Sequence, residues 1–206
     1  MARLQALPLT LPSDSVDRPG LFARLFIRYA YWFSRRRFGR VPGSVERLAY
    51  DPSSLAAVAG FELAFERGHA LSARLKELAS VKVATLIGCR FCIDIGSSIA
   101  KKHGVSEEEL LDLPGYRDSP RLSDLDKCVL DYAVAMSQTP VRIDDELFAR
   151  LERDLGRKAL VALTTAIAWE NFRARFNHAV GLKEEGYDGR VVCLLPTAID
   201  LTTSQP

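Results

Sequence analysis

The chain has 206 residues, of which 48% are hydrophobic, so one globular domain with a decorated terminus can bury a core without disulfide staples. Its 28 basic and 26 acidic residues leave a net charge of +2, which gives no case for a nucleic-acid partner. No apolar run reaches the ~20 residues of a membrane span. Four cysteines are too few for a secreted disulfide framework, so the composition predicts a reducing cytoplasm.

The N-terminal 50 residues are predicted to form an arm followed by an amphipathic helix. Residues 1–17 contain prolines and show no periodicity, which indicates an extended arm. Pro19 and Gly20 open a helix rich in aromatic residues, and three consecutive arginines, Arg35 to Arg37, favour its C-terminal end. We interpret this helix as packing on the core or on a second subunit. A helix that lies on a membrane surface or binds an anionic partner is the alternative.

Cap and turn residues then divide the chain into further helices. Asp51 followed by Pro52 predicts a helix start, and Ser72 predicts the next one. Gly88 ends that second helix, and Cys89 opens another that ends at Gly104. Residues 39–50 between the first two helices are predicted to be a linker.

Four more helices are predicted beyond Gly104, over residues 106–113, 123–137, 144–155 and 158–182. The last of these is almost wholly apolar in its first half, so it should cross the core. The tail after Gly186 contains an apolar run, VVCLLP, which could be a strand or a docking segment. Since no segment shows paired strand patterns, the predicted class is all-α.

The pair Cys89 and Cys92 carries the chemistry that the sequence suggests. Two cysteines spaced C-x-x-C at a helix start can close a disulfide with little backbone movement, and the helix N-terminus favours the thiolate. A structural zinc site would need two more ligands, whereas the other cysteines, Cys128 and Cys193, are isolated. Two buried, inert cysteines are the remaining alternative. We therefore predict a redox dithiol, with Cys128 a small buried hydrophobe.

The arrangement of Glu77, eleven residues, and then Cys89 and Cys92 resembles the alkylhydroperoxidase D / carboxymuconolactone decarboxylase superfamily. The segment ENFRARFNHAVGL, residues 170–182, extends the resemblance. It implies an AhpD-like helical bundle over residues 51–183, with residues 1–50 as an N-terminal extension and residues 184–206 as a tail. It also implies a homo-oligomer that reduces peroxides or disulfides without a metal or cofactor and depends on a thiol reductant. In that comparison Cys92 attacks and Cys89 resolves, although the spacing alone does not distinguish them.

The chain departs from the superfamily's redox motif, E-x11-C-x-x-C-x-x-x-H, because Gly96 stands where the histidine belongs. Glu77 lies about 16 Å along its helix from the bend at Gly88, so it cannot easily touch Cys92 without an intermediate. Gly96 leaves a space that water, Asp94 or a residue of another helix must fill. Asp94 and His178 are the candidates for the missing base.

Glu170 and Trp169, where the last helix turns from apolar to polar, are further candidates for the site.

Two rival functions stay open. The first is a carboxymuconolactone decarboxylase-like enzyme acting on a small organic acid, with Arg173 and Arg175 to bind the carboxylate. The second is a non-catalytic helical interaction module. Retention of both cysteines argues against the decarboxylase.

Overall fold

A computed structural model describes residues 20–188 of the chain. Every regular element in that range is a helix, which confirms the all-α class. The chain divides into two compact units, Met1–Arg67 and Gly68–Pro206, which we describe separately. The segment predicted to resemble the superfamily, residues 51–183, contributes to both units. The predicted arm, the apolar run VVCLLP and Cys193 lie outside the described residues.

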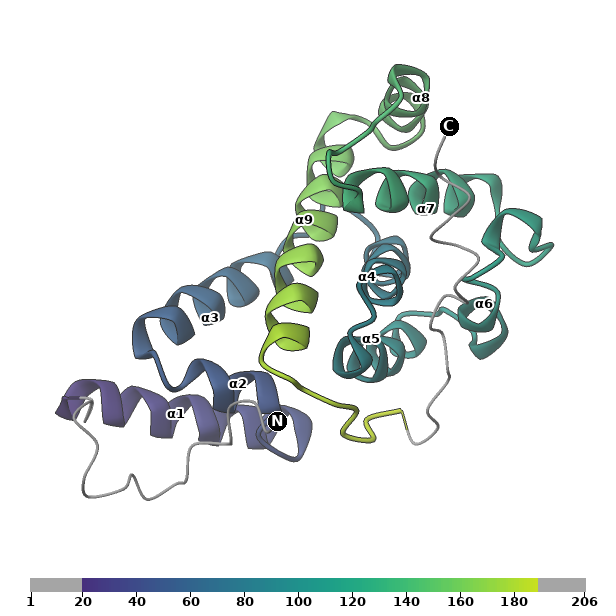
Figure 1. Ribbon diagram of the computed structural model, residues 1–206. Helices are drawn as coiled ribbons and strands as arrows, with labels where there is room; N and C mark the ends of the chain where they lie inside the picture. Colours follow the sequence, from purple (N-terminus) through teal and green to yellow (C-terminus); the bar gives the residue numbers. More distant parts are fainter. Residues whose placement is uncertain (1–19, 189–206) are drawn as a thin grey trace. The chain divides into compact units, whose positions relative to one another are not determined.

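The first unit contains the helices α1 (Leu21–Phe38), α2 (Gly43–Leu48) and α3 (Pro52–Glu66) (Figure 1). The start of α3 follows the predicted cap, because the side chain of Asp51 accepts hydrogen bonds from the backbone N–H groups of Ser53 and Ser54. The predicted linker over residues 39–50 is wrong in part, since it holds the short helix α2. This helix has no side-chain cap, and both α1 and α2 contact α3.

Helix α1 presents an apolar face to solvent as well as a buried one. Ile27 and Tyr31 are buried, whereas Phe22 is 86% exposed and Tyr29 and Trp32 are more than half exposed. This exposed face adds to the resemblance as a reason to expect a homo-oligomer, which stays a prediction. None of the helices in residues 20–188 is long and apolar enough to cross a membrane.

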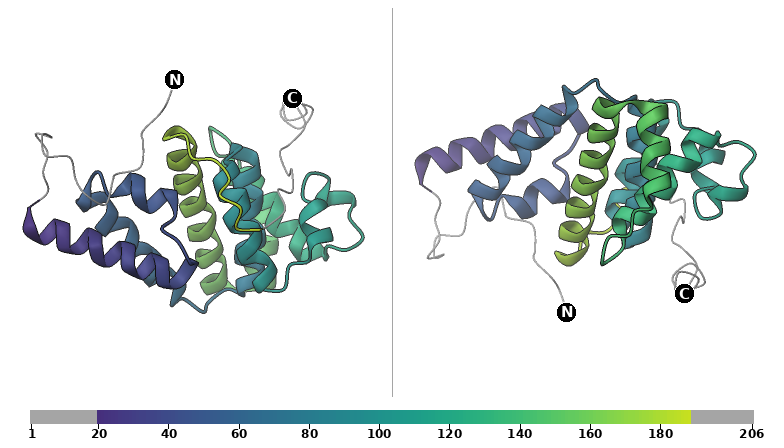
Figure 2. Two further views of the ribbon diagram at one scale, coloured as in Figure 1. Left: turned by 90° about the horizontal axis from the view of Figure 1, so that it is seen from below. Right: turned by 90° about the horizontal axis from the view of Figure 1, so that it is seen from above.

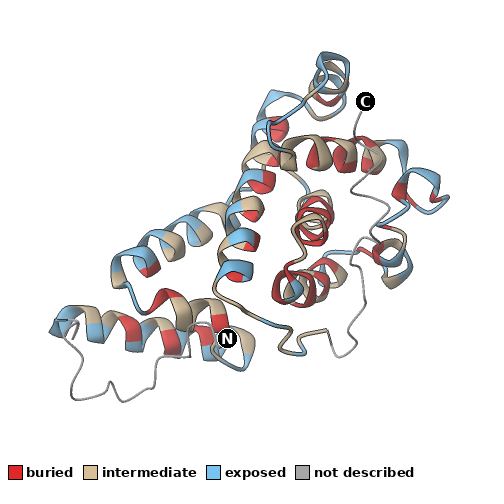
Figure 3. Cartoon of the chain, in the orientation of Figure 1, coloured by how far each residue is buried: buried red, intermediate tan, exposed pale blue. Residues whose placement is uncertain are grey.

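The second unit is built around a central helix. Its elements are α4 (Ala73–Ile87), α5 (Arg90–Lys102), α6 (Glu107–Leu111), the 3₁₀ helix η1 (Tyr116–Asp118), α7 (Asp124–Ser137), α8 (Asp145–Leu155) and α9 (Arg157–Ala179). Figure 1 shows α4 between α5, α7 and α9, and the two views of Figure 2 agree that α9 lies alongside it. Every residue from Leu78 to Thr85 is buried, as the red ribbon of α4 in Figure 3 shows. A helix that is enclosed by its neighbours can fix the positions of α5, α7 and α9 relative to one another.

Most helix ends in this unit lie where the local sequence predicts them. Ser72 caps α4 by accepting the backbone N–H of Leu75, and Gly88 ends the helix in the left-handed conformation with φ of 75°. The last helix is shorter than predicted, because it ends at Ala179 rather than near residue 182. Gly181 has a φ of 76°, and the N–H of Leu182 donates to the carbonyl of Asn177 at 3.0 Å, which closes the helix end.

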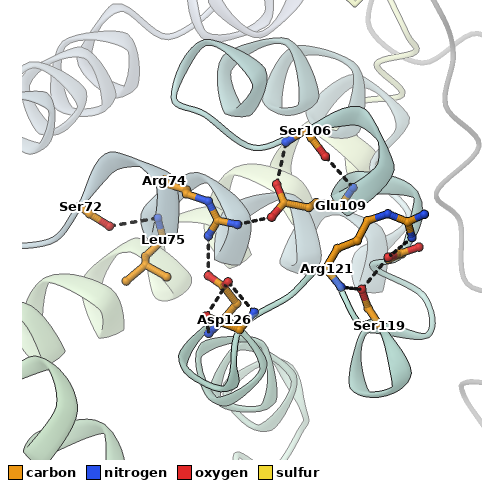
Figure 4. Close-up of polar contacts among 10 residues, drawn as sticks. Ser72, Arg74, Leu75, Ser106, Glu109, Ser119, Arg121 and Asp126 are labelled. Carbon is orange, nitrogen blue, oxygen red and sulfur yellow. Dashed lines mark hydrogen bonds and ion pairs between the residues drawn. The ribbon is translucent and has the colours of Figure 1, made fainter.

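Arg74, at the start of α4, joins the starts of two other helices (Figure 4). Its guanidinium donates to the carboxylates of Glu109 and Asp126. Each carboxylate also completes a capping box, with Ser106 on α6 and with Ser123 on α7. One partly buried cation therefore fixes the N-termini of α6 and α7 against the central helix.

We predict that Arg74→Met lowers the thermal stability of the protein. The variant leaves two largely buried carboxylates without their cation, and hydrogen bonds to charged groups contribute about 1.5–3 kcal/mol each. A loss of about 2 kcal/mol corresponds to a fall in Tm of roughly 4–8 °C for a chain of this size. Calorimetry measures it. The matched control is Arg150→Met, which removes an exposed ion pair with Asp154 and should change Tm by about 1 °C or less. Equal effects of the two substitutions would contradict the role given to Arg74.

Candidate active site

The two cysteines of the C-x-x-C pair lie at the tight turn between α4 and α5. The positive φ of Gly88 reverses the chain, which a residue with a Cβ would rarely do. Cys89 is then the N-cap of α5, and its Sγ accepts the backbone N–H of Cys92 at 3.2 Å. The two Cα atoms are 5.3 Å apart, and the two sulfurs are joined as a disulfide. The turn thus brings the predicted pair together.

Both sulfurs lie inside the protein. Cys89 is 1% exposed and Cys92 is 5% exposed, and both belong to an apolar cluster that includes Leu78, Val81 and Phe91. A thiolate is costly in such surroundings unless hydrogen-bond donors reach it. The backbone N–H of Cys92 is one such donor, directed at Cys89.

Asn177 on α9 supplies a second donor, and sequence reasoning missed it. Its side-chain Nδ2 donates to Cys92 Sγ at 3.3 Å, and the side chain is buried. The residue lies on the inward face of α9, in a buried stripe with helical spacing. The stripe consists of Leu163, Ile167, Glu170, Ala174 and Asn177. Extending this spacing from the apolar half of the helix would have predicted that Asn177 faces the core. The sequence pattern instead indicated the next residue, His178, as a candidate base.

That neighbour, His178, lies on the exposed side of the same turn. Its ring Nδ1 is 3.2 Å from the carbonyl oxygen of Gly88. Because a carbonyl oxygen only accepts hydrogen bonds, Nδ1 carries the proton and Nε2 is the basic nitrogen of the neutral ring. The structure therefore brings His178 to the cysteine-bearing turn without placing it against the buried Cys92.

Glu77 and Gly96 do not form the relay that the superfamily motif contains. Glu77 makes an ion pair with Lys76, at 3.6 Å. One turn after Glu77 on α4, the side chain of Val81 packs against Gly96, and a Cβ added at Gly96 would lie 3.3 Å from Val81 Cγ2. Of the occupants expected beside Gly96 (water, Asp94 or a residue of another helix), the structure shows a residue of another helix, and its side chain is apolar.

Asp94 is buried and holds the segment that follows α9. We call residues 183–188 the C-terminal strap. Asp94 Oδ2 accepts the backbone N–H groups of Glu185, Gly186 and Tyr187 at 2.7–3.1 Å, and Oδ1 accepts that of Asp188 at 3.1 Å. The left view of Figure 2 shows this segment running from the end of α9 across to α5. Both oxygens of the predicted base are thus engaged by the strap.

Two further contacts fix the strap on α5. Arg90 makes an ion pair with Glu184 at 3.1 Å, and Lys101 makes one with Asp188 at 2.9 Å. The ring of Tyr187 meets that of Phe91 edge to face. Tyr187 also packs against the apolar cluster that contains both cysteines. The strap therefore covers part of the cluster around the disulfide.

The other candidates have contacts of their own. Cys128 is a free, buried thiol on α7, and burial raises its pKa. Glu170 pairs with Arg173 one turn away, and Arg175 donates to Asn171, both within α9. The indole of Trp169 stacks on Phe172. Among residues 20–188, no three His, Cys, Asp or Glu side chains converge as a metal site requires.

Comparison with known proteins identifies the family. The model of the carboxymuconolactone decarboxylase family matches residues 52–124, which include both cysteines but not α9. The uncharacterized protein YnjA of Escherichia coli (strain K12) is 32% identical over 173 residues, which cover 84% of this chain and 92% of that protein.

Two solved structures share the fold at low sequence identity. A peroxidase-related protein from Silicibacter sp. TM1040 superposes with a TM-score of 0.74 at 17% identity, covering 92% of this chain and 96% of that one. The debrominase Bmp8 gives a TM-score of 0.72 at 19% identity, covering 85% and 95%. With the family model and a relative matched over most of its length, the chain belongs to the carboxymuconolactone decarboxylase family.

Proposed function

We propose that the chain is a thiol-dependent oxidoreductase that reduces peroxides through Cys89 and Cys92. The observation that carries the proposal is the pair itself, closed across the first turn of α5 with an N–H donor directed at each sulfur. The shared fold does not decide the chemistry, because its solved examples include a debrominase and a peroxidase-related protein. The site residues therefore carry the argument.

The catalytic cycle consists of three balanced steps. The Cys92 thiolate attacks one peroxide oxygen, so that an S–O bond forms, the O–O bond breaks and the departing alkoxide takes a proton to become an alcohol. The Cys89 thiol then attacks the sulfenic acid, releasing water and forming the disulfide. A dithiol reductant finally exchanges with that disulfide, is itself oxidised, and restores both thiols.

The burial of the pair favours a small peroxide as the oxidising substrate over a protein disulfide. With Cys92 only 5% exposed, a compact hydroperoxide can reach the sulfur with less displacement of its surroundings than a bulky disulfide. The organic-acid alternative requires guanidinium groups that bind a carboxylate. Arg173 and Arg175 instead contact side chains of their own helix, so the dithiol reading is preferred.

We predict that hydroperoxide converts the reduced protein to a Cys89–Cys92 disulfide while Cys128 stays a thiol. Cys128 should remain unreacted because burial raises its pKa and so lowers its thiolate fraction. Mass mapping after a stoichiometric peroxide pulse measures the pairing. Cys92→Ser should abolish peroxide consumption, whereas Cys128→Ser should leave it unchanged. Finding Cys128 or Cys193 as the main disulfide partner would overturn the proposal.

The closed space beside Gly96 leads to a second prediction. The relay lacks its imidazole, so turnover should be about a hundredfold to ten-thousandfold slower than with one. Gly96→His alone should destabilise the protein by about 1–3 kcal/mol, because the added side chain overpacks against Val81. Combined with Val81→Ala it should fit better and raise the peroxidase rate.

Stopped-flow peroxide consumption and Tm, measured on both single variants and the double variant, test this non-additivity. A stable double variant with an unchanged rate would show that the missing imidazole does not limit turnover. A Gly96→His variant as stable as wild type would show that Val81 does not close the space.

A third prediction tests the two predicted bases. Asp94→Asn replaces one acceptor oxygen with an amide donor, so the strap should loosen and amide hydrogen exchange at residues 185–188 should accelerate. Peroxide reduction by this variant should fall by less than tenfold. His178→Gln should also lower the rate by less than tenfold, because the ring lies on the exposed side of the turn and not against Cys92; a hundredfold loss would make His178 the base. A hundredfold loss in Asp94→Asn with unchanged exchange would instead make Asp94 the base.

A further inference from the structure

The hydrogen bond from Asn177 to Cys92 affects the ionisation of the sulfur as well as the packing around it. Within residues 20–188, the Asn177 amide is the side-chain donor that reaches Cys92 Sγ, and the contact is buried. The sulfur of a disulfide is a weak acceptor, whereas a thiolate is a strong one. A donor held against this atom therefore favours the reduced, ionised form over the disulfide.

We propose that Asn177 is a catalytic residue that stabilises the Cys92 thiolate. This inference rests on the proposed redox function. In the oxidative half of the cycle, Asn177 stabilises the attacking thiolate. In the reductive half, it stabilises the same sulfur as the leaving group when the reductant attacks Cys89. An amide cannot accept the proton, so it takes over only the charge stabilisation that an imidazole at residue 96 would supply.

The backbone around Asn177 holds the amide in place. Its own carbonyl accepts the N–H of Leu182 in the turn that ends α9, and the neighbouring Ala174 is fully buried against the cluster that contains Cys92. The donor is therefore fixed from both sides before any substrate arrives. A preorganised donor needs no rearrangement at the moment when charge develops on the sulfur.

The two sulfurs consequently receive different donors. Cys89 receives the backbone N–H of Cys92 at the start of α5, and Cys92 receives a side-chain amide from α9. The spacing of the two cysteines cannot distinguish their roles. The side-chain donor assigns thiolate stabilisation specifically to Cys92, the attacking residue in the proposed cycle. Because this donor is a side chain, it can be removed by substitution without disturbing the helix backbone.

The test uses the full chain with Cys89→Ser, Cys128→Ser and Cys193→Ser, so that Cys92 is its single thiol. Serine keeps an N-cap at residue 89. The ultraviolet absorbance of the thiolate, followed against pH, then reports the ionisation of Cys92 alone. Asn177→Leu keeps nearly the shape of the side chain and removes the donor without adding a charge, and it should reduce the ionisation constant of Cys92 by about tenfold or more. Asn177→Ala should act in the same direction.

The matched control is Asn171→Ala. Asn171 is also an amide on α9, but its Nδ2 donates to Ser137 Oγ and to the carbonyl of Ile167, away from the cysteines. The control should titrate as the parent does, even if its Tm falls. Unchanged Cys92 ionisation in folded Asn177→Leu, or an equal shift in Asn171→Ala, would overturn the proposal.

A redox measurement in the four-cysteine chain gives an independent readout. Loss of the donor destabilises the reduced form, so Asn177→Leu should shift the equilibrium with glutathione toward the Cys89–Cys92 disulfide by about tenfold. An equilibrium equal to that of wild type would count against Asn177. Failure of the proposed function looks different, because wild type itself would then form no disulfide with peroxide while its Cys92 ionisation still responded to Asn177.

Discussion

The left-handed turn at Gly88 is the constraint on which the site depends. It ends the buried helix α4, and in the next residue it makes Cys89 the N-cap of α5, so that Cys92 falls one helical turn away. The same turn leaves the Gly88 carbonyl directed at His178. Because α4 is buried on all sides, the turn cannot shift without disturbing the core. The position of the sulfurs is therefore set by the centre of the unit.

Where the superfamily's redox motif has an ionisable histidine, this chain has a packed valine, and the groups that donate to the two sulfurs are uncharged N–H groups. Val81 fills the place beside Gly96, and an amide from α9 contacts Cys92 where both side chains are buried. Such an arrangement stabilises a charge on sulfur but transfers no proton by itself. Of the two tasks that a single imidazole combines, these contacts therefore supply charge stabilisation only.

The C-terminal strap, residues 183–188, is held against α5, the helix that begins at the cysteine pair. Four backbone N–H groups converge on the carboxylate of Asp94, and ion pairs at Glu184 and Asp188 add to the attachment. Separating this carboxylate from its four N–H donors would cost free energy, because buried donors and an acceptor would lose their hydrogen bonds. The covering of the apolar cluster around the disulfide therefore depends on one buried side chain, two residues after Cys92.

The sequence by itself determined the α-helices of the second unit and the closeness of Cys89 to Cys92, because caps, turns and C-x-x-C spacing act over a few residues. It missed α2, which has no side-chain cap, and placed the end of α9 too late. Only the tertiary structure decided what lies around the sulfurs. Asn177 is 85 residues from Cys92, and Glu185 is 91 residues from Asp94. Contacts at such separations follow from how the helices pack, which local patterns do not encode.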